Sequence, residues 1–224
     1  MFEDLKNNID FYIREKTRFS RKNFVEKNEA VLYQTYLENL YVLDVLSKCF
    51  SVIKKEFVCA LDIGSKNWYY ANAEYSFLKS NYRDFLLKGV ELDAYRLYSN
   101  FYSRYEAAKF YTKNLKNTEY VAGNLLNIKG CYDYITWFLP FVLKSPLKCW
   151  GLPEKFFMPE TLLKYAYSIL GTNGQMLIIN QGEKEAIEQK LLLDNLQIPY
   201  TELGIIKSEF FEYKNIRYGF LIRK

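Results

Sequence analysis

Short apolar runs, separated by longer stretches of mixed polarity, recur along the chain from residue 57 onward. The first run is Phe57-Val-Cys-Ala-Leu-Asp-Ile63, and it ends at Gly64. An apolar run of this length that is bounded by a turn residue is typical of a buried strand in a parallel sheet. Similar runs occupy residues 89–92, 119–122, 132–138 and 175–179. The pattern therefore predicts five strands in this part of the chain.

Stretches with helical periodicity lie between these runs. Three- and four-residue spacing relates five of the apolar positions: Leu97, Phe101, Tyr105, Ala108 and Tyr111. This spacing predicts a helix over residues 97–115. Other stretches predict helices over residues 68–79, 159–170 and 183–195, the second of which leads through the turn Gly171-Thr-Asn-Gly174 into a strand. The alternation of strands and helices predicts a doubly wound, mostly parallel α/β sheet.

The N-terminal part of the chain has a different pattern. It contains no glycine or proline before Gly64, and apolar residues from Leu32 to Leu43 recur at three- and four-residue spacing. Both features are typical of amphipathic helices. We predict an N-terminal helical extension over residues 1–55, followed by one α/β domain over residues 56–224.

Two extended pieces close the chain. They occupy residues 209–213 and 216–222, and the turn-forming pair Lys214-Asn215 joins them. This arrangement predicts a terminal hairpin that adds an antiparallel strand to the sheet. With the five parallel strands, the hairpin gives a seven-stranded, mostly parallel sheet whose last strand is antiparallel.

The absence of histidine is the most restrictive feature of the composition. It removes the usual general base, the usual metal ligand and the middle member of a serine triad. Four cysteines occur, but no two have the spacing of a zinc site or a redox motif, so no metal is expected. The remaining chemistry is that of Asp, Glu, Lys, Tyr or Cys, or that of a reactive cofactor which the protein positions.

Charge and hydropathy indicate where the protein works. The chain has 31 basic and 26 acidic side chains, and the basic residues are spread along it with acids between them, so a nucleic-acid partner is not favoured. The N-terminal residues 1–5 lack the basic start and apolar run of a secretory signal. The longest apolar stretch, residues 134–143, is too short to cross a membrane. We expect a cytoplasmic protein without a membrane span.

Candidate chemistry lies where the predicted strands end, because open α/β sheets bind ligands at the carboxyl ends of their strands. Gly64 follows the first strand and permits a tight turn close to a ligand. Glu91 ends the second strand, where a carboxylate can accept hydrogen bonds from both hydroxyls of a ribose. Two simpler interpretations stay open: Gly64 is an ordinary turn residue, or Glu91 is an acid favoured at a helix start.

This order of strands and motifs resembles the class I methyltransferases that use S-adenosylmethionine, over roughly residues 55–224. Leu61-Asp-Ile-Gly64 is similar to the first motif of that family, whose loop wraps the cofactor. The resemblance implies backbone approach at Gly64, loop contacts from three residues and ribose binding by Glu91. The three loop residues are Asp62, Ser65 and Lys66. The residues that would contact the adenine are Asn124 and Leu125.

The same loop departs from the family pattern at two positions. The family usually has a second and often a third glycine where this chain has Lys66 and Trp68. The missing glycines argue against a dinucleotide, because a pyrophosphate requires close backbone approach at three glycines. We therefore expect S-adenosylmethionine, which has no phosphate, rather than a nicotinamide cofactor.

Residues after the fourth and fifth predicted strands are weaker candidates for contacts with an acceptor. Trp137 and Pro140 lead into a proline-punctuated segment that has the length of an active-site loop. Asn180 and Glu183 form a polar cluster after residues 175–179, although the same residues suit a helix cap. No catalytic base is assigned from the sequence.

Three functional hypotheses follow. The first is an S-adenosylmethionine-dependent methyltransferase whose acceptor and oligomeric state are unknown. The second is a binding or regulatory protein that keeps the methyltransferase fold without catalysis. The third is a methyltransferase that acts on RNA, for which the binding would weaken steeply with added salt.

Overall fold

The computed structural model describes residues 29–224, with side chains from residue 33 onward. The predicted helical extension before residue 29 lies outside these residues. The strands are β1 (Phe57–Ile63), β2 (Asp84–Glu91), β3 (Thr118–Ala122), β4 (Tyr132–Phe138), β5 (Leu170–Gln181), β6 (Thr201–Ile205) and β7 (Arg217–Arg223). The helices are α2 (Glu29–Cys49), α3 (Ala71–Asn81), α4 (Arg104–Thr112), α5 (Lys144–Cys149), α6 (Pro159–Ile169) and α7 (Gly182–Asn195), with short 3-10 turns η1 (Leu125–Asn127) and η2 (Glu154–Phe156).

The seven strands form one sheet in the order β3-β2-β1-β4-β5-β7-β6. β1 pairs in parallel with both β2 and β4, so the direction of winding reverses between β1 and β4. β7 lies between β5 and β6 and is antiparallel to both. This topology confirms the predicted fold class, a doubly wound and mostly parallel α/β sheet with an antiparallel last strand.

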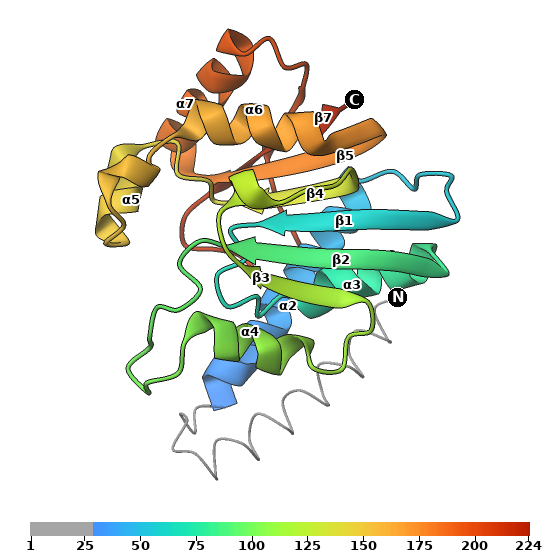
Figure 1. Ribbon diagram of the computed structural model, residues 1–224, viewed down its shortest axis with the longest axis vertical. Helices are drawn as coiled ribbons and strands as arrows, with labels where there is room; N and C mark the ends of the chain where they lie inside the picture. Colours follow the sequence, from blue (N-terminus) through green and yellow to red (C-terminus); the bar gives the residue numbers. More distant parts are fainter. Residues whose placement is uncertain (1–28) are drawn as a thin grey trace.

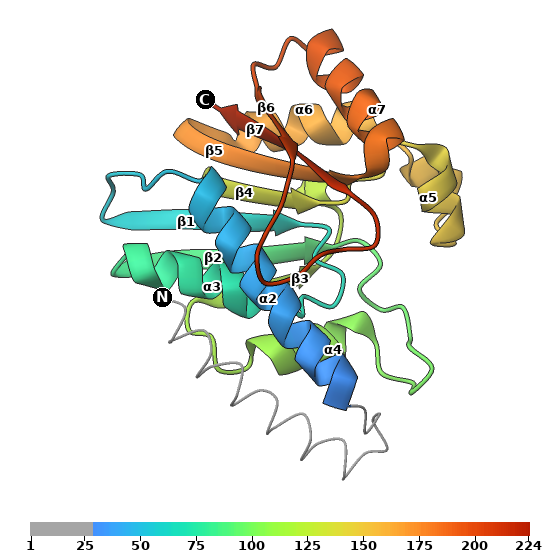
Figure 2. The same cartoon turned by 180° about the vertical axis from the view of Figure 1, so that it is seen from behind.

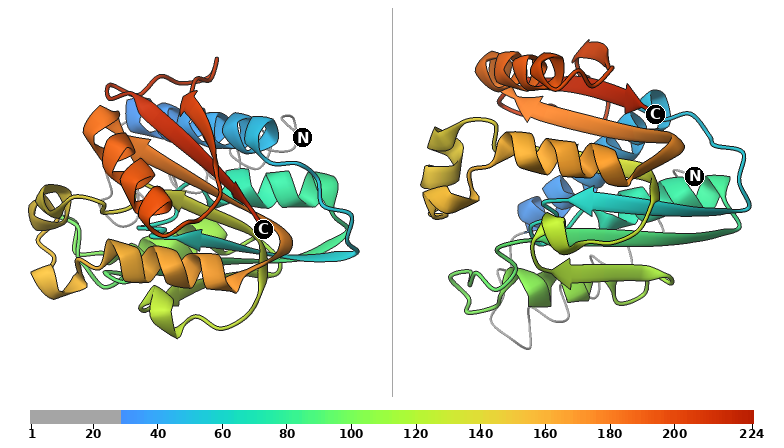
Figure 3. Two further views of the ribbon diagram at one scale, coloured as in Figure 1. Left: turned by 90° about the horizontal axis from the view of Figure 1, so that it is seen from above. Right: turned by 45° about the horizontal axis from the view of Figure 1, so that its top comes forward.

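Helices cover both faces of the sheet (Figures 1 and 3). On one face, α2 and α3 pack on buried sheet residues such as Val58 and Leu87, and α2 crosses in front of the sheet in Figure 2. On the other face, Leu163 of α6 and Leu193 of α7 pack on residues such as Ile178. The strand tips of β1, β2 and β4 point to the same edge, where α5 projects beyond the sheet (Figure 1).

Helix α2 is part of the first hydrophobic core. Leu43, Val45 and Leu46 are essentially inaccessible to solvent, and they pack with residues of α3 and the sheet. Burying each such aliphatic side chain stabilises the fold by about 1.5–3 kcal/mol. Within residues 29–224, no helix combines the length and the apolar composition that a bilayer crossing requires.

The predicted strand over residues 209–213 is wrong. This segment is a loop without strand structure, and Phe210, Phe211 and Tyr213 pack against the core on the α2 side. The Tyr213 ring makes an edge contact with Tyr41 at 5.0 Å between centroids. Besides β5, the strand that pairs with β7 is β6, which is more polar than residues 209–213. The apolar pattern of the loop thus reflects packing on a helix rather than a place in the sheet.

The predicted helix over residues 97–115 begins later than expected. Ser103 caps α4: its hydroxyl accepts a hydrogen bond from the Glu106 backbone, and the Glu106 side chain accepts one from the Ser103 backbone. Leu97 and Phe101 precede this cap, and both are exposed, Phe101 at 85%. Their apolar spacing therefore belongs to a surface loop.

Residues 171–174, which were expected to form a turn, lie within β5. The ladder is irregular there: Tyr132 pairs with Leu170 but Tyr134 pairs with Gln175, and Asn173 has a positive φ of 63°. The two glycines therefore flank an irregularity within the strand rather than a separate turn. Gly171 lies against its neighbouring strand so closely that a Cβ there would meet the Cys131 sulfur at 2.9 Å. This glycine permits close strand approach rather than a reversal.

Candidate functional site

The loop between β1 and α3 has an unusual backbone. Gly64, Lys66 and Trp68 all have positive φ, at 72°, 54° and 47° respectively. Such φ values are favourable for glycine and cost other residues about 1–2 kcal/mol each. The two positions at which the sequence lacks a glycine therefore keep the backbone conformation that glycine would adopt.

Contacts on both sides hold this loop against β2. The backbone N–H groups of Gly64 and Ser65 donate to the Val90 carbonyl at 2.9 and 3.2 Å. The Trp68 ring is fully buried over Gly89, where a Cβ would come within 2.9 Å of it. β2 can approach the loop this closely only because residue 89 has no side chain. The strained conformation persists because its surroundings determine it.

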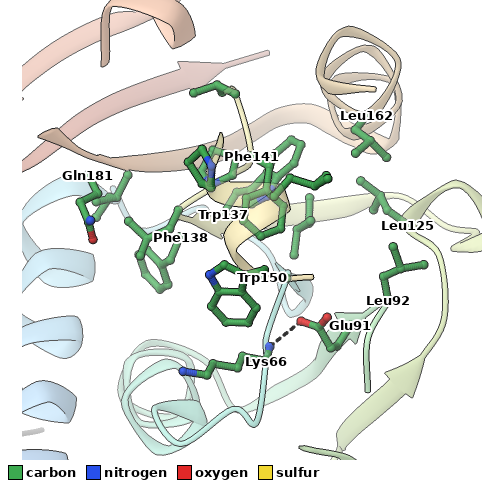
Figure 4. A pocket seen from close by; sticks show the side chains of 18 of the residues that line it. Lys66, Glu91, Leu92, Leu125, Trp137, Phe138, Phe141, Trp150, Leu162 and Gln181 are labelled. Atoms are coloured by element: carbon green, nitrogen blue, oxygen red, sulfur yellow. Dashed lines mark hydrogen bonds between the residues drawn. The ribbon is translucent and has the colours of Figure 1, made fainter. Parts of the chain in front are cut away.

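Glu91 lies at the carboxyl end of β2 and is 8% exposed. Its Oε2 accepts the backbone N–H of Lys66 at 2.8 Å, which Figure 4 shows as a dashed line, and its Oε1 accepts that of Asp93 at 2.8 Å. An ionised carboxylate has about four acceptor positions, so further hydrogen bonds remain available. The carboxylate is thus fixed in place and can still bind donors from a ligand.

A cluster of cations and one indole lies over this carboxylate. Arg104 is buried; its Nη1 lies 3.2 Å from Asp93 Oδ2 and 3.9 Å from Glu91 Oε1. The Trp150 ring lies 4.5 Å from the Arg104 guanidinium and 5.3 Å from the Lys66 ammonium, and Figure 4 shows it in front of Lys66 and Glu91. Burial lowers the pKa of Lys66, and the charge of Arg104 lowers it further.

A second polar network is buried beneath the loop. The Tyr70 hydroxyl donates to Asp62 Oδ2 at 2.8 Å, and Trp68 Nε1 donates to Glu74 Oε2 at 2.7 Å. The Thr136 hydroxyl lies 3.0 Å from Asp62 Oδ1 and 2.6 Å from Glu74 Oε1. Three elements, β1, α3 and β4, are therefore tied together through two carboxyl groups.

Proton counting requires that this network contains a protonated carboxyl group. The Thr136 hydroxyl has one proton, so it can donate to Asp62 or to Glu74 but not to both. The other contact needs a proton from the carboxyl side. Burial raises the pKa of Glu74 well above its usual range, and the nearby Asp62 charge raises it further. Burial also raises the pKa of Asp62, to about 7. The buried Asp62–Glu74 pair therefore holds a proton, and we interpret Glu74 as the group that donates it to Thr136.

Asn124 follows β3 at the predicted adenine position. Its Oδ1 accepts the Leu126 backbone N–H at 2.9 Å and so caps the η1 turn. This bond leaves the amide Nδ2 as a donor toward the cavity that Asn124 lines. The next residue, Leu125, is buried and forms an apolar wall of the same cavity.

A cavity of about 360 Å³ lies at the carboxyl ends of the parallel strands. Most of the predicted site residues line it: Gly64, Lys66, Glu91, Asn124, Leu125, Trp137 and Pro140. The segment after β4, which contains α5, forms one wall through Phe141 and Trp150. Residues from the ends of four successive strands therefore meet at one cavity, and their contact with a ligand stays a prediction.

Four predicted residues lie outside the lining of this cavity. Asp62 and Ser65 are fully buried beneath the loop, where the Ser65 hydroxyl donates to the Asp62 carbonyl at 3.0 Å. Asn180 is fully buried with both amide atoms unpartnered among the described residues, and Glu183 is exposed on α7. Direct ligand contact by these four residues stays a prediction. Their positions support structural roles for Asp62 and Ser65.

Other residues replace them at the β5 end of the cavity. Gln181, Glu185 and Arg217 line it, together with Tyr41 of α2 and Tyr213 of the β6–β7 loop. Burial raises the pKa of Glu185, whose Oε2 accepts the Gln181 backbone N–H at 2.9 Å. No local sequence pattern indicated these residues, because they come from segments far apart in the chain.

Arg104 and Trp150 were also missed, although each had a signal. The sequence Ser103-Arg-Tyr-Glu106 has the capping-box pattern, which places Arg104 at the start of a helix that follows β2. Trp150 lies in the proline-punctuated segment that was expected to form an active-site loop. A stricter use of the capping box would have predicted the Arg104 position.

Comparison by sequence finds no relative: no protein-family model matches the chain, and no curated protein matches it.

Comparison by structure finds many methyltransferases. A SAM-dependent methyltransferase from Aquifex aeolicus superposes with a TM-score of 0.57 at 15% identity, over 81% of this chain and 88% of that one. The magnesium protoporphyrin IX methyltransferase from Synechocystis PCC 6803, with bound SAM, gives 0.55 at 10% identity, over 99% and 97%. The plantazolicin methyltransferase BpumL, in complex with SAH, gives 0.53 at 16% identity, over 99% and 98%. The chain has the fold of the class I SAM-dependent methyltransferases.

Proposed function

We propose that the protein is an S-adenosylmethionine-dependent methyltransferase that acts on a small molecule. The observation that carries this proposal is the position of Glu91, a fixed carboxylate at the end of β2 beside the loop of residues 64–68. Such a carboxylate binds the two hydroxyls of a ribose in nucleotide-binding sheets of this kind. Because the chain has the methyltransferase fold, we infer that the ligand that contains this ribose is S-adenosylmethionine.

The residues around Glu91 fit this cofactor. Leu92, Leu125 and Leu162 lie together on one side of the cavity, where they offer an apolar surface to an adenine (Figure 4). Asn124 provides an amide donor at the same end. The loop at Gly64 provides backbone close to the amino-acid part. Bound here, S-adenosylmethionine supplies an electrophilic methyl group on a sulfonium.

The chain itself would then orient and enclose the reactants. Glu91 would hold the ribose, and the wall formed by Phe141 and Trp150 would exclude water from the cavity. Alignment of donor and acceptor accounts for about 7–11 kcal/mol of barrier reduction in well-oriented reactions. A dedicated general base is not required when the acceptor is already nucleophilic.

A second candidate is a non-catalytic protein that keeps this fold. Its support is that both Glu91 oxygens already accept backbone N–H groups and that Trp150 stacks on Arg104 beside them. A site that satisfies its own polar groups in this way has less need of a ligand. The two candidates differ in whether the protein binds the cofactor.

Calorimetric titration with S-adenosylmethionine and S-adenosylhomocysteine tests the proposal. We expect saturable binding, and Glu91→Ala should weaken it about 100-fold, because two hydrogen bonds to a charged group are lost. Glu119→Ala is the matched control, since Glu119 is a half-exposed carboxylate on the neighbouring strand β3, and it should bind like the wild type. Absence of binding by the wild-type protein would favour the non-catalytic candidate.

A further inference from the structure

Arg217 lies at the β5 end of the cavity near Glu185, whose pKa its charge lowers, but it makes no ion pair among residues 33–224. Its Nη1 donates to Gln181 Oε1 at 2.6 Å, and its guanidinium lies 4.4 Å from the Tyr213 ring. Among residues 33–224, no carboxylate lies within the 4.0 Å that defines an ion pair with this side chain. An arginine has five N–H donors in a planar fork that matches a carboxylate. Most of those donors remain available to a ligand in the cavity.

The Tyr41 hydroxyl is a second unused donor at this end. Tyr41 is 5% exposed and lines the cavity, yet its hydroxyl oxygen has no hydrogen-bond partner in the part of the chain that the structure describes. Buried polar groups are rarely left unpaired, and exceptions often mark a missing ligand. Burial raises the pKa of Tyr41, so the hydroxyl keeps its proton and can donate it.

Aromatic rings form the walls between these donors and the loop after β1. Tyr69 and Tyr70 meet edge to face at 5.2 Å, and Tyr70 and Phe138 do so at 5.3 Å. All three residues line the cavity, and Figure 4 shows Phe138 between Gln181 and Trp150. Flat ring surfaces of this kind suit the apolar or aromatic body of a small molecule.

The polar groups at this end select a hydrogen-bond acceptor. Arg217 and Tyr41 are donors, and Gln181 Oε1 is already occupied by Arg217, which leaves its amide N–H₂ as a further donor. Glu185, a carboxyl group that lines this end, accepts a hydrogen bond from the Gln181 backbone, and the Arg217 charge lowers its pKa against the effect of burial. An ammonium group would meet the Arg217 charge, whereas a carboxylate would satisfy the unused donors.

We propose that this end of the cavity is the acceptor subsite and takes a small molecule with an aromatic or apolar body and a carboxylate, which Arg217 and Tyr41 bind. The inference rests on the proposed function, because an acceptor must lie beside the cofactor. A nucleophilic atom of the acceptor would form a bond to the methyl carbon while the sulfonium–methyl bond breaks. The electron pair of that bond stays on sulfur, and the proton of the nucleophile leaves to water.

Matched pairs of probes test the charge requirement. The protein saturated with S-adenosylhomocysteine is titrated with phenylacetate and indole-3-acetate, and then with the neutral phenylacetamide and indole-3-acetamide. We expect the carboxylates to bind at least about tenfold more tightly than their amides, as a charge-assisted hydrogen bond predicts. Equal affinity for acids and amides, or no binding of either, would overturn the proposal.

Variants of two arginines in β7 test which residue causes the preference for carboxylates over amides. Arg217→Gln should remove the preference for the acids, and Arg217→Lys should reduce it, because lysine cannot form a bidentate pair. Arg223→Gln is the matched control: it removes the same charge from an exposed position at the other end of β7 and should leave the preference unchanged. An equal loss in Arg223→Gln would show general charge attraction and contradict a site at Arg217.

Tyr41→Phe separates a binding role from a structural one. It removes only the unpartnered hydroxyl, so we expect weaker binding of the acids by several-fold together with a higher melting temperature. A lower melting temperature with unchanged affinity would contradict the assigned role. The variants that change acid binding are expected to bind S-adenosylhomocysteine like the wild type.

The cofactor also carries a carboxylate. A final comparison shows whether Arg217 binds the carboxylate of the acceptor or that of the cofactor. If Arg217→Gln weakens S-adenosylhomocysteine tenfold but leaves its decarboxylated analogue unaffected, Arg217 binds the cofactor and the acceptor proposal fails. If the wild-type protein does not bind S-adenosylhomocysteine at all, the proposed function fails instead. The acid and amide titrations without nucleotide still report on Arg217 in that case.

Discussion

The two ends of the cavity differ in how many of their polar groups have hydrogen-bond partners within the protein. At the Glu91 end, both Glu91 oxygens and the backbone N–H groups of residues 64–66 have partners within the protein, and a buried network ties β1, α3 and β4 together. Among the buried donors there, Arg104 Nε has no partner in residues 33–224. At the Arg217 end, a guanidinium and a buried hydroxyl have unused donors. The first end is held in place mainly by its own contacts, although Glu91 keeps acceptor positions for a ligand, whereas the second end has donors that the protein itself leaves without partners.

The difference follows from how the chain supplies each end. The residues of the Glu91 end come mainly from two consecutive β–α connections, so neighbouring backbone can satisfy them locally. The Arg217 end joins α2, the end of β5, the start of α7 and the β6–β7 loop. Stability should therefore be concentrated at the Glu91 end and ligand selectivity at the Arg217 end.

Replacing Trp68 tests this contrast most strongly. Trp68→Ala should lower the free energy of unfolding by about 4 kcal/mol, because a fully buried ring is lost and Glu74 loses a donor. Urea unfolding monitored by circular dichroism measures the change. Trp150→Ala is the control: it removes an indole that is only partly buried over the cavity, and it should cost about 1 kcal/mol or less. Equal losses for the two variants would contradict the proposed concentration of stability.

The pH dependence of stability should report the protonated Glu74. Because its pKa in the folded protein is raised above the unfolded value near 4.3, the folded state binds the proton more tightly. This contribution to stability is then fully present below about pH 4 and declines as the pH rises toward the folded pKa, at about 1.4 kcal/mol per pH unit for each proton. Asp62, whose pKa burial raises to about 7, adds a second contribution of the same sign.

Glu74→Gln removes this titration while it keeps the geometry of the protonated acid. A glutamine amide can donate to Thr136 and accept from Trp68, so the variant should match the wild type near pH 4 and exceed it at pH 8. Urea unfolding at several pH values measures the slope. Glu119→Gln, at a half-exposed carboxylate, should keep the wild-type slope. Parallel curves for Glu74→Gln and the wild type would show that Glu74 is not the proton carrier.

Two tyrosine hydroxyls should have opposite effects on stability. Tyr70→Phe removes the donor to Asp62 Oδ2 at the satisfied end and should destabilise the protein by about 1–2 kcal/mol. Tyr41→Phe removes an unpartnered buried hydroxyl at the unsatisfied end and should stabilise it by about 1 kcal/mol. Melting temperatures of the ligand-free variants measure both changes. If both substitutions changed the melting temperature in the same direction, the proposed difference between the two ends of the cavity would be contradicted.

The smallest expected effect concerns the strained loop. Lys66→Gly relieves a side chain from a positive φ of 54° and should stabilise the protein by about 0.5–1 kcal/mol. Lys66→Ala removes the same ammonium but keeps the strain, so it should give no such gain. Chemical unfolding of both variants provides the measurement. A destabilised Lys66→Gly variant would show that the side chain itself, through Trp150 or Arg104, holds the loop.

The sequence allowed the sheet to be predicted well where burial is two-sided. β1 and β4 are apolar along almost their whole length, because both of their faces are covered, and they were found with correct bounds. β6 was missed because it is a short edge strand with exposed residues such as Thr201 and Glu202. The segment of Phe210 and Phe211 was misread, because packing on a helix leaves the same apolar signature as a strand.

The candidate site could be predicted only for residues that end a strand or directly follow one. Glu91 and Gly64 follow directly from the rule that ligands bind at the carboxyl ends of strands. Arg217 and Tyr41 are far apart in sequence, so no local pattern relates them. The Asp62–Glu74 pair was not predicted for another reason. Glu74 lies within α3, and an acidic residue in a helix is normally interpreted as a solvent-exposed surface residue.

The position of β7 has a consequence for how the protein forms. A chain made from its N-terminus produces β5 and β6 before residues 217–223. Within residues 29–224, this last segment is the only strand that pairs with β6, and it covers the outer edge of β5. Until that segment arrives, the nascent protein carries the open edge of β5, a surface that invites pairing with other chains. We expect that loss of residues 217–223 would turn a folding protein into an aggregating one, and that dependence on chaperones during synthesis would be greatest in this interval.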